Sequence, residues 1–187
     1  MKDKHYLLKT FENKITKSEI IGLAESAGSD FLVGELLELT ISAKHPSAAF
    51  RSAWLLETIL ILYPAKFLPY TDQFFNLYPQ QSNPGCQRHF TKIMMLCLKN
   101  SEFVPENAEH IFDQIVETTF DWLAGESPVA VKANCMDVLY LLQRRNRWIK
   151  EELNAQIEFL MRDGSPAIQS RGKRLLRRIM HSNNIIE

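Results

Sequence analysis

The chain has 187 residues, a length that suits one domain or two very small ones. Hydrophobic residues make up 45% and charged residues 24%, which excludes a disordered, collagen-like or fibrous protein. The 22 Lys and Arg balance the 22 Asp and Glu, so the average charge argues against a dedicated nucleic-acid binder. Only 7 glycines and 8 prolines are present, which is poor material for the many turns of an all-β fold.

The cysteines and the apolar runs indicate the cellular compartment of the protein. The odd number and wide spacing of Cys86, Cys97 and Cys135 favour reduced, buried thiols over a disulfide framework. Residues 1–14 carry scattered charges and lack the apolar core of a signal peptide. The apolar run over residues 53–63 is too short to span a membrane. We therefore expect a cytoplasmic protein without membrane contact.

Three helices are predicted at the start of the chain, over residues 4–13, 18–27 and 30–44. Gly28 is predicted to end the second helix, and Ser29 is a candidate N-cap for the third. The third helix is expected to pair with the helix that follows it.

Four prolines then mark a repeat, at positions 46, 84, 128 and 166, with separations of 38, 44 and 38 residues. Internal periods of roughly 40 residues are typical of arrays of helix pairs. The prolines follow His45, Asn83, Ser127 and Ser165, and the last three of these can act as N-caps. Because proline is favoured at the first helical position, each proline is predicted to begin a helix.

The residues after these prolines are in register. The second, tenth, thirteenth and fourteenth positions lie on one side of a helix, and all sixteen residues there are apolar: Ala48, Cys86, Ala130, Ile168, Leu56, Met94, Val138, Leu176, Ile59, Cys97, Leu141, Ile179, Leu60, Leu98, Leu142 and Met180. Further amphipathic helices are predicted over residues 70–78, 105–123 and 149–161. The pattern predicts nine or ten helices and no strand.

Residues 45–59, 127–142 and 165–179 resemble the second helix of HEAT and armadillo-type repeats. Such helices typically open with a small or acidic turn and a proline, followed about five positions later by a basic residue. That position holds Arg51, His89 and Arg171 after Pro46, Pro84 and Pro166, and Ala133 breaks the pattern after Pro128. The resemblance covers about residues 30–182 and implies an all-α, right-handed α-α superhelix of about four helix pairs. The expected organisation is one HEAT-like domain over residues 1–187, with capping helices over residues 1–29.

No catalytic motif, glycine-rich phosphate loop or zinc-binding pair is present in the sequence. We therefore expect a non-enzymatic scaffold without cofactor or metal, whose concave face binds a protein or peptide partner. The predicted contact residues are Arg51, Trp54, His89, Lys92, Met136, Tyr140, Arg171 and Arg174. All but Tyr140 occupy the fifth or eighth position after a repeat proline, where the helix is expected to turn away from its apolar columns.

Charge is unevenly distributed along the chain. Residues 1–141 hold 12 Lys and Arg against 17 Asp and Glu, and residues 142–187 hold 10 against 5. The basic end is either a cap that pairs with neighbouring acids or an anion-binding surface, and capping is favoured.

A resemblance to DNA alkylation repeat glycosylases gives the alternative function, DNA binding or base excision. The second helices would supply the basic and aromatic residues Arg51, Trp54, Arg88, Lys92, Lys132 and Tyr140, and Asp137 is their only aspartate.

Overall fold

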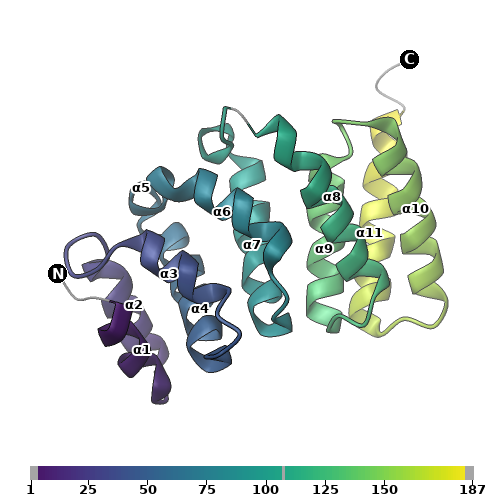
Figure 1. The fold of residues 1–187 in the computed structure, drawn as a ribbon. Helices are drawn as coiled ribbons and strands as arrows, with labels where there is room; N and C mark the ends of the chain where they lie inside the picture. The colour runs from purple at the N-terminus through teal and green to yellow at the C-terminus, as the bar shows by residue number, and fades with distance from the viewer. Residues whose placement is uncertain (1–3, 107, 184–187) are drawn as a thin grey trace. The chain divides into compact units, whose positions relative to one another are not determined.

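A computed structural model of the chain describes residues 4–106 and 108–183, and most of this backbone is helical (Figure 1). The helices are α1 (Lys4–Glu12), α2 (Lys17–Ser26), α3 (Val33–Thr40), α4 (Pro46–Leu62), α5 (Pro64–Phe67), α6 (Thr71–Leu77), α7 (Pro84–Lys99), α8 (Glu109–Ala124), α9 (Val129–Leu142), α10 (Arg147–Arg162) and α11 (Pro166–Asn183). Short 3-10 helices cover Leu68–Tyr70, Tyr78–Gln80 and Ser101–Phe103. Within the described ranges, extended pairing is confined to an isolated bridge between Ala27 and Phe31. The all-α prediction is confirmed.

The beginning of the array follows the prediction only in part. Gly28, at a φ of 89°, adopts a conformation that suits glycine just after α2 ends. Ser29 does not cap α3, because that helix begins at Val33 and its N-cap position is Leu32. The capping box of α2 was not predicted. In it, the hydroxyl of Thr16 accepts a hydrogen bond from the backbone N–H of Glu19, and the carboxylate of Glu19 accepts one from the backbone N–H of Thr16.

Three of the four repeat prolines begin helices, namely Pro46, Pro84 and Pro166. Pro128 does not, because its ψ of 148° is extended and places it at the N-cap, so that α9 begins at Val129. The prediction for this proline is therefore wrong by one residue. In the first turn of α9, Val131 is buried and Ala130 is exposed. Of the sixteen apolar column residues, only Ala130 and Met180 are exposed.

The predicted caps before these prolines also differ from one another. Asn83 caps α7, its Oδ1 accepting a hydrogen bond from the backbone N–H of Gly85 at 2.9 Å. Ser127 is not an N-cap, because Pro128 occupies that position of α9. The buried hydroxyl of Ser165 has no hydrogen-bond partner among the described residues. Only Asn83 therefore confirms the cap prediction.

Contacts divide the chain into two compact units, Met1–Phe112 and Asp113–Glu187, and α8 crosses the boundary between them. In the first unit, α4 packs against α1, α2, α3 and α7, and α3 also contacts α6. Buried aromatic rings form much of its core: Phe74 lies against Phe67, Phe75, Tyr78 and Phe90. Burying such rings is a large part of what stabilises a helical array.

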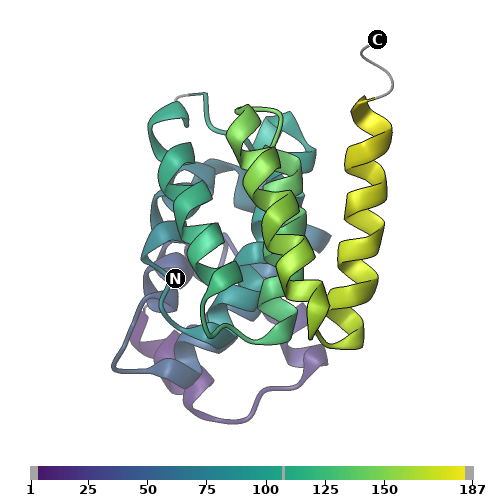
Figure 2. The same cartoon turned by 90° about the vertical axis from the view of Figure 1, so that its right-hand side faces the viewer.

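In the second unit, α9, α10 and α11 contact one another. Figure 2 shows α10 and α11 side by side and running in opposite directions, joined by the turn after α10. The single-domain organisation expected over residues 1–187 stays a prediction. None of the described helices combines the length and the apolar character needed to cross a membrane.

Candidate functional site

The second helices α4, α7, α9 and α11 carry the eight predicted contact residues. Arg51 and Trp54 lie on α4, His89 and Lys92 on α7, Met136 and Tyr140 on α9, and Arg171 and Arg174 on α11. Most of these side chains contact other parts of the chain rather than open solvent, and they do so in a repeated arrangement.

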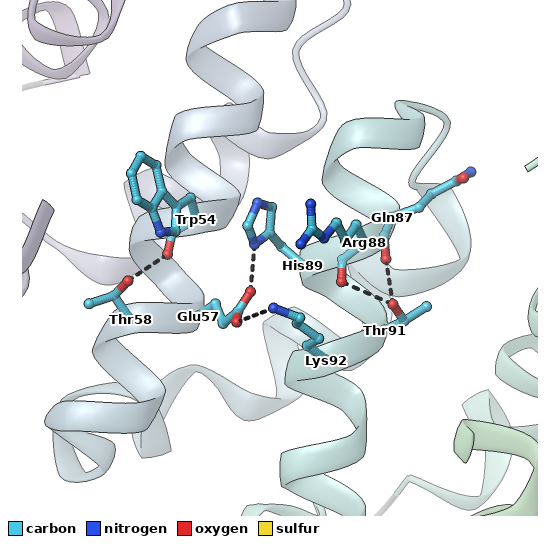
Figure 3. Close-up of polar contacts among 8 residues, drawn as sticks. All are labelled: Trp54, Glu57, Thr58, Gln87, Arg88, His89, Thr91 and Lys92. Atoms are coloured by element: carbon cyan, nitrogen blue, oxygen red, sulfur yellow. Dashed lines mark hydrogen bonds and ion pairs between the residues drawn. The ribbon is translucent and has the colours of Figure 1, made fainter. Parts of the chain in front are cut away.

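In the first unit, Glu57 joins α4 to α7 (Figure 3). Its Oε2 lies 2.5 Å from Nδ1 of His89, and its Oε1 accepts a hydrogen bond from Nζ of Lys92 at 2.9 Å. Because an ionised carboxylate only accepts hydrogen bonds, Nδ1 of His89 carries a proton here. Burial alone would raise the pKa of Glu57, but the hydrogen bonds and positive charges of His89 and Lys92 outweigh it and lower that pKa.

In the second unit, Asp137 joins α9 to α11 in the same way. Its Oδ1 accepts a hydrogen bond from Nη2 of Arg174 at 3.1 Å, and its Oδ2 pairs with Nη1 of Arg171. Burial and the neighbouring charge of Arg174 lower the pKa of Arg171. Since two arginines hold the Asp137 carboxylate, the alternative reading of this residue as a catalytic aspartate gains no support.

Both arrangements place one carboxylate between the fifth and eighth residues of the next second helix. The same positions in α9 are the apolar Ala133 and Met136, both buried, and α7 contains no acidic residue. In α4, the fifth residue Arg51 instead donates from Nη1 to the backbone carbonyl of Phe11. These positions therefore serve contacts within the chain.

Two of the predicted contact residues need correction. Met136 is fully buried in the core, so it cannot contact a partner. His89 is 7% exposed and points toward Glu57, so it acts inside the protein. Glu57 was not among the predicted site residues, and Asp137 was named only for the DNA alternative. A lone carboxylate interrupting the apolar run of a second helix was the signal that could have found them.

An open groove of about 530 Å³ lies beside the first half of α4, entirely within the first unit. Its apolar lining includes Ile15, Phe50 and Trp54, and its two charged lining residues are Lys14 and Arg51. Among the described residues, no acidic side chain lines it. The groove therefore combines exposed aromatic surface with cationic groups.

The three cysteines are buried, as predicted from their spacing. Burial raises the pKa of Cys86 and of Cys97 to about 12 in each case, and it also raises the pKa of Cys135. Thiols of this kind stay protonated and are poor nucleophiles. Within residues 4–106 and 108–183, no three His, Cys, Asp or Glu side chains are grouped as metal ligands would be.

Comparisons with known proteins agree with the repeat. Neither a curated protein nor a solved structure matches the chain. The family model of the HEAT repeat domain matches residues 7–179, which takes in both units and almost every described helix. With its proline-led second helices and their repeated carboxylate bridges, the chain therefore belongs to the HEAT repeat family.

Proposed function

We propose that the chain is a non-enzymatic interaction module that binds a protein or peptide partner along its second helices. HEAT repeats generally serve as scaffolds for protein interactions. The observation that carries the proposal here is the open groove beside α4, where two predicted contact residues, Arg51 and Trp54, come together. A groove with apolar walls and a few polar groups is the usual form of a recognition site.

The remaining predicted residues take secondary parts. The side chains of Lys92, Arg171 and Arg174 are 37%, 30% and 50% exposed, which leaves donor atoms for a partner beside their internal ion pairs. Tyr140 is half-buried. We place the principal contacts at Arg51 and Trp54 because these two line a recess.

A selection from a random peptide display library on the immobilised full-length chain tests this function. We expect enriched peptides that bind the wild type and lose binding to Trp54→Ala. The control is Trp148→Ala, since Trp148 is 43% exposed but lies on α10, away from the groove lining. Failure to enrich any peptide that depends on Trp54 would contradict the proposal, as would turnover of a substrate.

Nucleic acid is the alternative occupant, and the same protein can test it. A gel shift with a short DNA duplex at low and moderate salt reports phosphate contacts, whose affinity falls steeply with salt. Duplex binding that Trp54→Ala abolishes would favour the DNA-binding alternative and overturn the peptide proposal. The internal pairing of Arg171 and Arg174 with Asp137 supports the peptide partner, because it engages two of the five Lys and Arg residues of α11 within the chain.

A further inference from the structure

We propose that the groove beside α4 binds an acidic peptide segment in which a carboxylate neighbours an apolar side chain. This inference rests on the proposed function and adds the chemistry of the partner. It commits to one arrangement, with the carboxylate at Lys14 and Arg51 and the apolar side chain between Phe50 and Trp54.

The charge of the groove is one-sided. Lys14 is exposed and makes no ion pair within the described part of the chain. Arg51 uses Nη1 for the carbonyl of Phe11, and its guanidinium carries further N–H donors. Because no acidic side chain of residues 4–106 or 108–183 lines the groove, a carboxylate that enters it would meet two cations and no like charge from these residues.

The aromatic wall is held in place before any partner arrives. The ring of Phe50 is 38% exposed and meets the ring of His89 edge-on, with centroids 5.2 Å apart. His89 is itself fixed by Glu57, as Figure 3 shows. On the other side, a Cβ on Gly85 would lie only 3.0 Å from Cδ2 of Phe50, so glycine leaves room for the ring.

Preorganisation of this kind lowers the entropic cost of binding. Trp54 lies one helical turn beyond Phe50 on the same face of α4 and also lines the groove. Two aromatic side chains with donors around them fit an apolar side chain flanked by carboxylates.

A nucleic-acid backbone fits this surface less well. Phosphate binding draws on many cations spread along a face, whereas the groove holds two, and one is partly committed to a backbone carbonyl. A short acidic peptide needs only one or two such contacts. The observations therefore favour the peptide.

The test is an NMR titration of the ¹⁵N-labelled full chain with acetyl-Glu-Glu-Leu-Phe-Glu-Glu-amide. The three tryptophans give three indole signals, and Trp54→Phe identifies the one in the groove. We expect the Trp54 signal to move with peptide while those of Trp122 and Trp148 stay in place. An unmoved Trp54 signal, or equal movement with the peptide in which lysine replaces glutamate, would overturn the inference.

A matched pair of charge reversals sharpens the result. Lys14→Glu is expected to weaken binding of the acidic peptide roughly three- to tenfold at about 150 mM salt. Lys17→Glu is the control, because Lys17 is also exposed and close in sequence but does not line the groove. Equal weakening by the two variants would mean that net charge, and not the groove, attracts the peptide, and would contradict the proposal.

The two levels of the proposal fail in different ways. If the display selection yields peptides that depend on Trp54 but are not acidic, the interaction function stands and the acidic specificity is wrong. If no peptide depends on Trp54, both are wrong. A short DNA duplex that moves the Trp54 signal more strongly than the acidic peptide would overturn the inference in favour of nucleic acid.

Discussion

Nδ1 of His89 lies 2.5 Å from Oε2 of Glu57, although 32 positions separate the two residues in the chain. Asp137 and Arg171 make the corresponding contact in the second unit, since His89 and Arg171 are both the fifth residue after a repeat proline. In both units, a carboxylate of one second helix therefore pairs with the fifth and eighth residues of the next. Charged contacts at fixed positions set how neighbouring helices slide against each other, because a shift of one turn would separate the partners.

Removing the Glu57 charge tests how much this bridge stabilises the first unit. Glu57→Gln keeps the shape of the side chain but leaves His89 and Lys92 without their anion. We expect the free energy of unfolding, measured in urea, to fall by about 1–3 kcal/mol, the range for hydrogen bonds to charged groups with little exposure.

Glu38→Gln is the control for this variant. Glu38 pairs with Lys4 at 3.2 Å, but the two side chains are 58% and 48% exposed. Solvent screens such a pair, so the variant is expected to change stability by less than about 0.5 kcal/mol. Similar losses of stability in the two variants would show that the Glu57 bridge between α4 and α7 stabilises the protein no more than an exposed ion pair does.

The same carboxylate predicts a dependence on pH. The pKa of Glu57 in the folded chain lies below its ordinary value of 4.5, so protonation favours the unfolded chain. Its contribution to stability is full above that value and is lost as the pH falls through the folded pKa. We expect the stability difference between wild type and Glu57→Gln to shrink between about pH 5.5 and pH 3. A difference that stays constant over this window would contradict the assignment.

The sequence predicted the helix pairs well because their signals are local. Apolar periodicity and proline position decide where helices form, and Pro46, Pro84 and Pro166 all begin helices. The prediction for Pro128 was wrong because proline is equally compatible with an extended N-cap position. Only the backbone ψ angle distinguishes that position from the first helical position. The short helix Pro64–Phe67 was missed because four residues are too few to display a period.

The candidate site was harder to predict because it depends on contacts between helices. The spacing set the fifth and eighth positions apart from the apolar columns, but it could not show what they meet. Arg171 and Arg174 look like an anion-binding cluster until Asp137, from another helix, is placed between them. Met136 occupies a position of the same class and is buried. Whether such a position faces solvent or a neighbour is decided by tertiary packing.

A methyl group at Gly85 tests whether the position of Phe50 matters for binding. In Gly85→Ala the new Cβ would approach Cδ2 of Phe50 to 3.0 Å, so the ring has to move by a few tenths of an ångström. Alanine is a good residue for the first turn of α7, and we expect little change in stability. The affinity for the acidic hexapeptide, followed by the Trp54 indole signal, is expected to fall by a factor of about two to five. Unchanged affinity would mean that the position of the Phe50 ring does not matter for peptide binding.

The two glycines inside α2 and α11 predict opposite responses to the same substitution. Gly22 has no neighbour within 4 Å of a built Cβ, so Gly22→Ala is expected to stabilise the chain by about 0.5–1 kcal/mol through helix propensity. At Gly172, a Cβ would lie 2.6 Å from Sδ of Met161 and 2.9 Å from Cγ2 of Ile157, both on α10.

Overpacking of this kind typically costs about 1–3 kcal/mol, which exceeds the gain in propensity. Gly172→Ala is therefore expected to lower the free energy of unfolding by about 1 kcal/mol. Urea unfolding of the two variants separates the effect of helix propensity from that of overpacking. Helix propensity acts in both variants, whereas close contact with α10 occurs only at Gly172. If Gly172→Ala were as stabilising as Gly22→Ala, the close packing of α10 on α11 would have no energetic consequence, and Met161 would have to move aside freely.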